Sequence, residues 1–174
     1  MDMEKIEKAK KGDAQSFYEL ITERRELLYK TAYLYVKNEQ DALDIVGETV
    51  YHAFRSIGKL KHAEYFTTWL VKILINQSLL MKKKSRSGWP LLTERDIADA
   101  EAGLAVEDKL DLLEAVDRLN EPYKTVIILK YLHDLPNSQI AEILETPVGT
   151  VKTHLHRALK KLKAYIGGRP NHEF

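Results

Sequence analysis

Residues 137–163 constrain the fold of this chain more than any other part of its sequence. Ile140, Ala141 and Leu144 share one face of a first predicted helix, and the small Ala141 lets another helix approach closely. Pro147 suits the first position of a second helix, where no backbone N–H is needed. An apolar stripe at helical spacing follows, formed by Val151, Leu155, Ala158 and Leu162. The pattern therefore predicts two helices joined by a tight turn.

The second helix and the residues after it carry basic side chains and no acidic ones. Between positions 148 and 170 the bases are Lys152, Arg157, Lys160, Lys161, Lys163 and Arg169. Such one-sided charge is typical of a surface that binds phosphate. It predicts a helix-turn-helix whose second helix enters the major groove and reads base edges from its N-terminal turns. The alternative is an ordinary solvated helical hairpin, but turn, stripe and charge together favour DNA binding.

The composition bounds the class of protein. A length of 174 residues allows one large or two small domains, and the formal net charge is only +1. The chain has no cysteine, which excludes disulfides and thiolate metal sites. Its N-terminus lacks the apolar core of a signal peptide, and no apolar run approaches the roughly 18 residues of a membrane span. We expect a soluble, cytoplasmic protein.

Apolar spacings of three and four residues recur along most of the chain and predict an all-α fold. Between positions 93 and 121, ten acidic residues oppose three basic ones, and the residues before position 106 are weakly patterned. We therefore predict two small helical domains, residues 1–86 and 107–168, joined by an acidic linker, residues 87–106. The β-branched run 122–129 resembles a strand by propensity. We predict a helix there, because Pro122 can start one and no partner strand exists.

An acidic stripe lies on one face of the helix predicted between positions 39 and 57. Asp41, Asp44 and Glu48 stand at i, i+3 and i+7. Such a stripe serves either solubility or docking of a basic partner, and composition does not choose between the two.

The segment 65–86 combines aromatic, polar and basic residues. Phe66, Trp69, Lys72 and Asn76 could stack on and hydrogen-bond unpaired bases, as in proteins that bind single strands. Taken alone, Phe66 and Trp69 are more simply core anchors. The basic run 82–86 is either a phosphate track or a solvated helix end.

Residues that could form an enzyme site are missing from the pattern. The sequence shows no nucleophile with its base, no paired carboxylates and no phosphate-binding loop. His154 and His156 are two apart on a helix, so they point about 200° apart and cannot share a metal. We expect no catalytic site, no cofactor and no small-molecule substrate.

With these residues laid out, the chain resembles an extracytoplasmic-function sigma factor, a small specificity subunit of bacterial RNA polymerase. Three segments carry the resemblance: residues 41–49 (DALDIVGET), residues 66–70 (FTTWL) onward to Asn76, and the helix-turn-helix of residues 140–162. Together, in this order, they cover nearly the full length. The alternatives are a free-standing helix-turn-helix regulator, which would need a sensory or dimerising domain, and a helical adaptor, which the basic helix argues against.

The resemblance implies a role for each domain. The N-terminal domain would dock on the polymerase clamp and capture the melted minus-ten element, and the C-terminal domain would read the minus-thirty-five element as duplex. The polymerase-binding residues would be Asp41, Asp44 and Glu48. Near the melted strand would lie Leu60, Lys61, Thr68, Lys72 and Asn76. Near the duplex would lie Thr150, Lys152, Thr153, His156, Arg157 and Lys160.

Several positions depart from the family pattern. Gly47 replaces a usual glutamine, which lowers helix stability and removes a side chain from the polymerase-binding helix. Leu60 stands where an aromatic is common, and Glu145 where many such turns have glycine, so the turn is strained if Glu145 has a positive φ. His154 and His156 replace what are often arginine or aromatic positions. These departures affect which promoter sequence the protein would recognise, and they do not change the class of protein that the motifs indicate.

The resemblance also implies regulation by a partner. The helical pattern begins within the first few residues and leaves no room for a masking N-terminal region. We therefore expect an anti-sigma factor, often a membrane protein with a cytoplasmic segment, and a role in an envelope or extracytoplasmic stress response.

Overall fold

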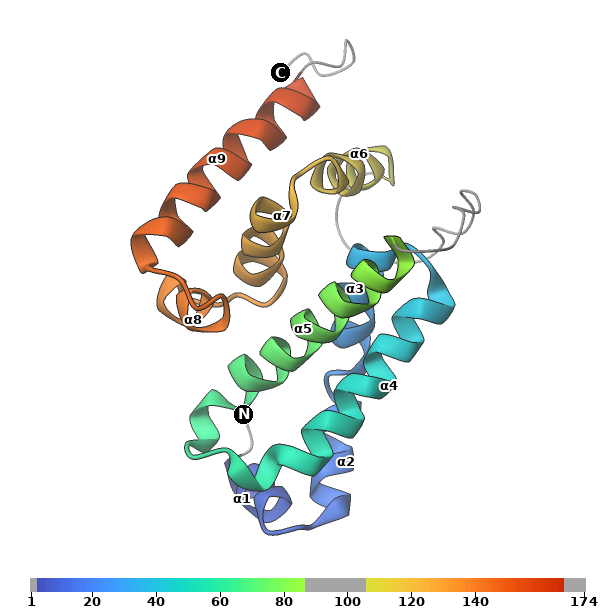
Figure 1. Ribbon diagram of the computed structural model, residues 1–174, viewed down its shortest axis with the longest axis vertical. Coiled ribbons are helices and arrows are strands. Elements are labelled where there is room, and N and C mark those ends of the chain that lie inside the picture. The colour runs from blue at the N-terminus through green and yellow to red at the C-terminus, as the bar shows by residue number, and fades with distance from the viewer. Residues whose placement is uncertain (1–2, 87–105, 168–174) are drawn as a thin grey trace. The chain divides into compact units, whose positions relative to one another are not determined.

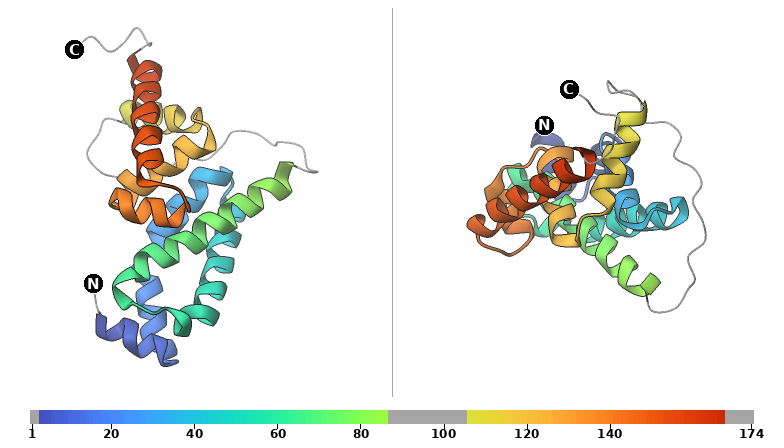
Figure 2. Two further views of the ribbon diagram at one scale, coloured as in Figure 1. Left: turned by 60° about the vertical axis from the view of Figure 1, so that its left-hand side comes forward. Right: turned by 90° about the horizontal axis from the view of Figure 1, so that it is seen from above.

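The computed structural model describes residues 3–86 and 106–167, and every regular element in these two ranges is helical (Figures 1 and 2). This confirms the predicted all-α class. The chain divides into two compact units, Met1–Trp89 and Pro90–Phe174. The division falls inside the range predicted as a linker, but residues 87–105 of that range lie outside the described residues. The limits of the linker stay a prediction.

The N-terminal unit contains five α-helices and two short 3-10 turns between Met3 and Arg86. They are α1 (Met3–Lys10), α2 (Ala14–Thr22), α3 (Arg25–Val36), α4 (Glu39–Ser56), η1 (Ile57–Lys59), η2 (Ala63–Tyr65) and α5 (Phe66–Arg86).

Local chemistry explains where these helices begin and end. Gly12 follows α1 with a φ of +98°, a conformation that glycine adopts without steric cost. The Asp13 side chain then caps α2 by accepting a hydrogen bond from the Gln15 N–H at 3.2 Å. Asn38 caps α4 in the same way, through the Asp41 N–H at 2.8 Å. These two caps fix where α2 and α4 begin.

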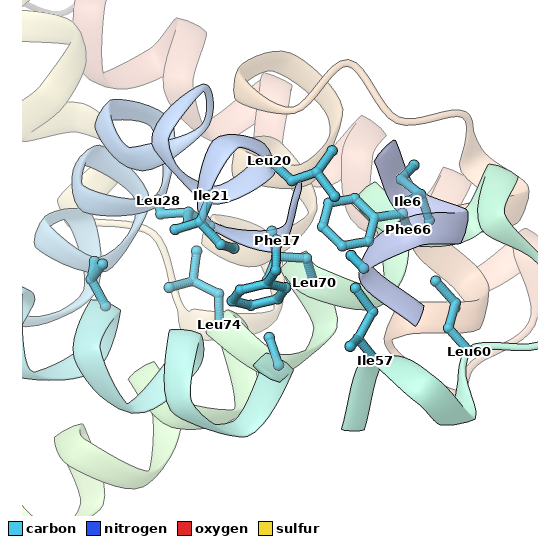
Figure 3. Close-up of a cluster of buried hydrophobic side chains, with 14 of the residues drawn as sticks. Ile6, Phe17, Leu20, Ile21, Leu28, Ile57, Leu60, Phe66, Leu70 and Leu74 are labelled. Atoms are coloured by element: carbon cyan, nitrogen blue, oxygen red, sulfur yellow. The ribbon is translucent and has the colours of Figure 1, made fainter. Parts of the chain in front are cut away.

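A single apolar core holds the N-terminal unit together (Figure 3). Phe66, Leu70 and Leu74 point from α5 into this core and are at most 1% exposed. Phe17 and Leu20 of α2 are buried in the same cluster. Burying one such side chain contributes about 1.5–3 kcal/mol, so α5 is fixed mainly by this face. Because α4 packs against both α3 and α5, its opposite face is left outward.

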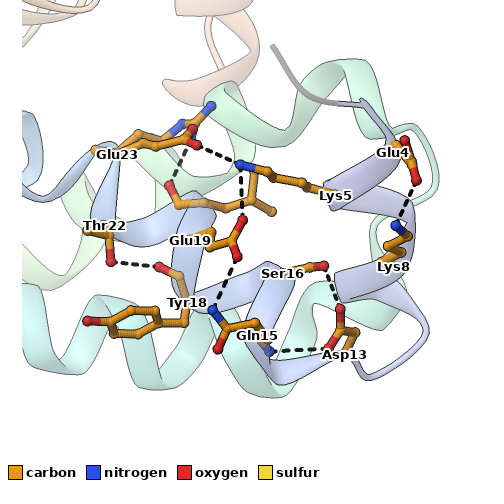
Figure 4. Close-up of polar contacts among 12 residues, drawn as sticks. Glu4, Lys5, Lys8, Asp13, Gln15, Ser16, Tyr18, Glu19, Thr22 and Glu23 are labelled. Carbon is orange, nitrogen blue, oxygen red and sulfur yellow. Dashed lines mark hydrogen bonds and ion pairs between the residues drawn. The ribbon is translucent and has the colours of Figure 1, made fainter.

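Ion pairs attach α1 to the end of α2 (Figure 4). The Lys5 Nζ lies 3.0 Å from Glu23 Oε1 and 3.1 Å from Glu19 Oε2. Hydrogen bonds to Glu23 and then Glu19 raise the pKa of Lys5, and the Lys5 hydrogen bond lowers the pKa of Glu23. These contacts orient the short first helix.

The C-terminal unit is also helical over the part that the structure describes. Its elements are α6 (Val106–Asp117), α7 (Glu121–Ile127), the π-helical turn η3 (Ile128–Leu132), α8 (Asn137–Ile143) and α9 (Val148–Gly167). The β-branched run 122–129 is therefore helical, as predicted. Val126 and Leu129 within it are fully buried, so burial among helices overrides the strand propensity. Lys124 Nζ joins α7 to α6 through Asp117 Oδ1 at 2.8 Å.

Candidate functional site

Helices α8 and α9 form the predicted helix-turn-helix. The first helix buries Ile140 and Ala141, and all four residues of the α9 stripe are buried as well. Helix α9 begins at Val148, one residue later than predicted, because the Pro147 carbonyl already accepts the Thr150 N–H at 2.9 Å. Pro147 thus stands just before the first helical residue rather than in it. The buried stripe fixes which side of α9 faces outward.

The turn between the two helices contains a left-handed residue. Glu145 has a φ of +52°, and the next residue, Thr146, donates its N–H to the Ala141 carbonyl at 3.0 Å. A non-glycine residue in this region costs about 1–2 kcal/mol, because its Cβ approaches the following carbonyl. The strain expected for a positive φ at Glu145 is therefore present.

We predict that Glu145→Gly stabilises the C-terminal unit by about 1 kcal/mol, because relief of the left-handed strain exceeds the added freedom of the unfolded chain. Chemical denaturation of the full chain, followed by hydrogen exchange of α8 and α9 amides, measures this. Glu142→Gly in α8, where the backbone is helical, is the matched control and should destabilise instead. Equal destabilisation by both variants would contradict the prediction.

The outward side of α9 carries the residues predicted to contact duplex DNA. Thr150 is half-buried, and the other five are exposed: Lys152, Thr153, His156, Arg157 and Lys160. The Thr153 hydroxyl donates to the Gly149 carbonyl at 2.9 Å, so its oxygen remains able to accept. No acidic residue occurs in α9. The helix therefore presents a positive surface that begins in its first turns.

Two further residues of α9 face α7 rather than this surface. The His154 ring packs edge-on against the Tyr123 ring, with centroids 5.4 Å apart, and Lys161 Nζ lies 5.7 Å from the same ring. His154 therefore helps to seat α9 on α7.

The acidic stripe on α4 divides into two parts. Asp44 and Glu48 are exposed, with contacts only along the helix: Gln40 Nε2 donates to Asp44 Oδ1 at 3.1 Å, and His52 Nε2 lies 3.7 Å from Glu48. Asp41 is half-buried in the first turn, where a carboxylate is favoured by the helix dipole. The start of the helix thus explains why an acidic residue stands at Asp41, but it does not explain Asp44 or Glu48.

The residues expected near a melted strand are not all at the surface. Lys61 and Asn76 are exposed and Lys72 is half-buried, whereas Leu60 is 9% and Thr68 5% exposed. Leu60 belongs to the core cluster of the N-terminal unit, and Thr68 lies on a buried side of α5. Leu60 and Thr68 are therefore buried in the free chain, and their place near a melted strand stays a prediction.

Two exposed aromatic residues near Lys61 did not figure in the sequence-based prediction. Tyr65, the last residue of η2, is 41% exposed, and the ring of exposed His62 lies 6.1 Å from its ring. The helical periodicity of α5 could have indicated this exposure. Phe66 is fully buried, and the residue directly before it points in a different direction, so Tyr65 does not share its burial. Lys61, His62 and Tyr65, called here the aromatic–basic loop, form one exposed cluster.

The described residues show neither a metal site nor a membrane span. No group of three or more histidine, aspartate or glutamate side chains among them is arranged to hold a metal ion. None of the helices within residues 3–86 and 106–167 has the length and apolar character needed to cross a bilayer.

Comparison with known proteins identifies the family. Residues 20–87 match the family described as Sigma-70 region 2, and residues 109–162 match Sigma-70, region 4. The RNA polymerase sigma factor SigV of Bacillus subtilis (strain 168) is 37% identical over 147 residues, which cover 84% of this chain and 88% of that protein. The ECF RNA polymerase sigma factor SigW of the same organism is 30% identical, covering 95% and 97%. The chain belongs to the extracytoplasmic-function sigma factors.

A solved sigma factor shares the fold. The sigma factor RpoE of Bartonella quintana, in complex with the anti-sigma factor NepR, superposes with a TM-score of 0.76 at 22% identity, covering 88% of this chain and 98% of that one. The relatives named above are regulators of transcription rather than enzymes. As a sigma factor, the chain directs RNA polymerase to promoters, and the surfaces described above are the candidates for its contacts.

Proposed function

We propose that the exposed side of α9 reads the minus-thirty-five element of the promoter in the major groove. The observation that carries this proposal is that a helix with no acidic residue exposes Lys152, Thr153, His156, Arg157 and Lys160. Arg157 and Lys152 provide charge-assisted donors for guanine edges or phosphates. Thr153 and His156 have shorter polar side chains that can also form hydrogen bonds to the DNA. Thr150 lies in the first turn, at the edge of this surface.

We predict that Arg157→Ala or Lys152→Ala weakens binding of the minus-thirty-five duplex by about 1–3 kcal/mol. If the residue reads a base, the loss is confined to the matched site. If it holds a phosphate, the loss is similar on scrambled DNA and the salt dependence becomes shallower by about one ion. Binding of the full chain to both duplexes, measured over a range of salt, separates the two roles, and exposed Lys11→Ala in the N-terminal unit is the control. Wild-type affinity that does not change with salt would contradict this assignment.

The aromatic–basic loop and the outer side of α5 are proposed to hold the melted minus-ten strand. Lys61, Lys72 and Asn76 supply charge and hydrogen bonds, and Tyr65 and His62 supply faces on which a base can stack. The side chains of Leu60 and Thr68 are buried, so we propose no direct contact between them and the strand.

We predict that Tyr65→Ala weakens binding of the holoenzyme to a promoter with a preformed minus-ten bubble by about 1–3 kcal/mol, because stacking on one base is lost. Tyr65→Trp should retain binding. Tyr18→Ala is the matched control, since Tyr18 is an exposed tyrosine of α2, 65% exposed. An equal loss on fully paired duplex DNA, or no loss on the bubble, would remove Tyr65 from the proposed surface.

The acidic edge formed by Asp44 and Glu48 is proposed to dock on basic groups of core RNA polymerase, with Asp41 supporting the start of α4. A pull-down with core polymerase tests this step and excludes a free-standing regulator if the chain joins the enzyme. The chain is proposed to act in the cytoplasm, where its polymerase is, and to have no catalytic activity of its own.

An anti-sigma partner is proposed to control this protein. Support comes from its likeness to a sigma factor solved in complex with an anti-sigma factor. Two separate units, each with exposed binding residues, give such a partner surfaces to cover. We propose that it is membrane-anchored and that its release belongs to an envelope stress response. Transcription from the target promoter, measured with and without co-expressed operon neighbours, tests this control.

A further inference from the structure

The segment that contains the aromatic–basic loop has a regular pattern of burial. From η1 to the start of α5 every third residue is buried: Ile57, Leu60, Ala63 and Phe66. The two positions between successive buried residues are exposed, and these positions include Lys61, His62 and Tyr65. In the 3-10 turns η1 and η2, side chains three residues apart lie on the same side of the backbone. Where the exposed residues point therefore depends on what the buried side packs against.

The buried side of this segment packs against α1. Helix α1 contacts both η1 and η2. It contributes Ile6 and Ala9, which are 0% and 2% exposed, to the cluster that also holds the buried residues of the segment (Figure 3). A Cβ on Gly58 of η1 would lie 3.4 Å from the Lys10 carbonyl oxygen, so the backbone of η1 passes close to the end of α1. The conformation of the aromatic–basic loop therefore depends on the position of α1.

Ion pairs set the position of α1. This helix has only eight residues, and a helix of that length is not stable alone. Lys5 joins it to the end of α2 through Glu19 and Glu23 (Figure 4). Glu23 also accepts a hydrogen bond from Arg24 Nη1 at 3.3 Å, and the Arg24 guanidinium lies 5.3 Å from the centroid of the Phe66 ring. One carboxylate thus connects α1 to a side chain that packs on the first residue of α5.

We propose that α1 positions the aromatic–basic loop for the melted minus-ten strand, and that Lys5 is the positioning residue that fixes α1. Stacking on a base requires the Tyr65 ring at a defined place. If the loop adopts other conformations, the apparent affinity falls with the fraction of chains in the binding conformation. The inference rests on the proposed function of the loop and adds the element that sets its shape. The alternative is that α1 contributes only to the stability of the N-terminal unit.

Lys5→Glu tests this role in the holoenzyme, with a promoter that has a preformed minus-ten bubble. Three carboxylates then repel one another where one ammonium group joined two. We expect the Kd for the bubble to rise about three- to tenfold. In the full chain, amide hydrogen exchange of η1 and η2 should become faster while that of α3 does not change. Circular dichroism should show the helix content of the wild-type chain, because the substitution leaves the core intact.

Two further variants separate the ion pairs from the charge. Lys5→Arg keeps the positive charge beside Glu19 and Glu23 and should bind the bubble within about twofold of wild type. Lys8→Glu makes the same charge change on the same helix, at an exposed lysine that pairs with Glu4, and is the matched control. An equal loss in Lys5→Glu and Lys8→Glu would overturn the proposal, since net charge would then be the cause. Wild-type affinity of Lys5→Glu would overturn it as well.

A double-variant cycle with Tyr65→Ala separates positioning from stability. If Lys5 acts through the loop, the combined loss in Lys5→Glu/Tyr65→Ala should be smaller than the product of the two single losses, because the ring to be positioned is gone. Losses that multiply in full would overturn the proposal. Tyr65→Ala by itself judges the loop. If it weakens binding and Lys5→Glu does not, the loop holds the strand without help from α1. If Tyr65→Ala has no effect, the proposed function of the loop is wrong, and the role of α1 is wrong with it.

Discussion

The double variant Asp44→Lys/Glu48→Lys is expected to assemble with core RNA polymerase at least about 100-fold less well than the wild-type chain. Two attractive contacts become repulsive if basic groups face these positions, and like-charge contacts at an interface cost several kcal/mol. Both side chains are exposed and contact only Gln40 and His52 of their own helix. The core behind α4 is therefore undisturbed, and the helical circular dichroism should be unchanged. Native gel or mass photometry titrations of polymerase with the variant measure assembly.

A control must separate this contact from net charge. Glu4→Lys/Glu7→Lys changes the net charge by the same amount on α1, where each carboxylate pairs with a lysine of its own helix. It should leave assembly within a few-fold of wild type, because exposed pairs contribute little. Equal losses in both double variants would indicate a long-range charge effect. Full assembly of the Asp44/Glu48 variant would mean that the stripe serves solubility alone.

Helix positions in this chain could be predicted because the buried faces repeat at helical spacing. The stripe from Val151 to Leu162 is buried at all four positions, whereas Leu159 of the same helix is 44% exposed. The β-branched run that ends at Leu129 was predicted to be helical because the chain offers no partner strand, although its residues favour a strand by propensity. The strain at Glu145 was expected for a positive φ, because many such turns in the family that the chain resembles have glycine at this position.

Which polar residues reach the surface could not be predicted in the same way. A motif aligns residues by sequence, but exposure depends on which side of a helix packs against its neighbours. Thr68 and Leu60 were expected at the DNA and are buried, whereas Tyr65 was missed and is exposed. A hollow lined by Tyr29, Leu43 and Gly47 arises from packing between the α2–α3 segment and α4, and no sequence pattern specifies it.

His133 is a further buried residue that the sequence did not single out, and its burial predicts that the C-terminal unit loses stability in acid. It follows η3 and is 8% exposed, and its backbone N–H donates to the Ile128 carbonyl at 3.2 Å. Burial lowers the pKa of its imidazole from 6.5 to about 4. In the unfolded chain the ring binds a proton below pH 6.5, while the folded protein keeps it neutral down to about pH 4. The unfolded state therefore binds more protons in this window, and stability falls as the pH falls.

We expect the C-terminal unit to lose about 3 kcal/mol of folding free energy from this one group between pH 6.5 and pH 4, since one pKa unit corresponds to 1.36 kcal/mol. Stability above pH 7 should not depend on it. Hydrogen exchange of α7 and α9 amides in the full chain, followed against pH, measures the loss.

His133→Gln keeps a polar side chain that does not titrate. Its stability should be lower at neutral pH but should fall less steeply below pH 6.5, because carboxylates elsewhere in the chain supply the remaining slope. Parallel curves for the two proteins would show that His133 is protonated in the folded state and that its burial does not control acid stability. Converging curves would show that burial of a neutral imidazole next to the helix-turn-helix contributes to the loss of stability in acid.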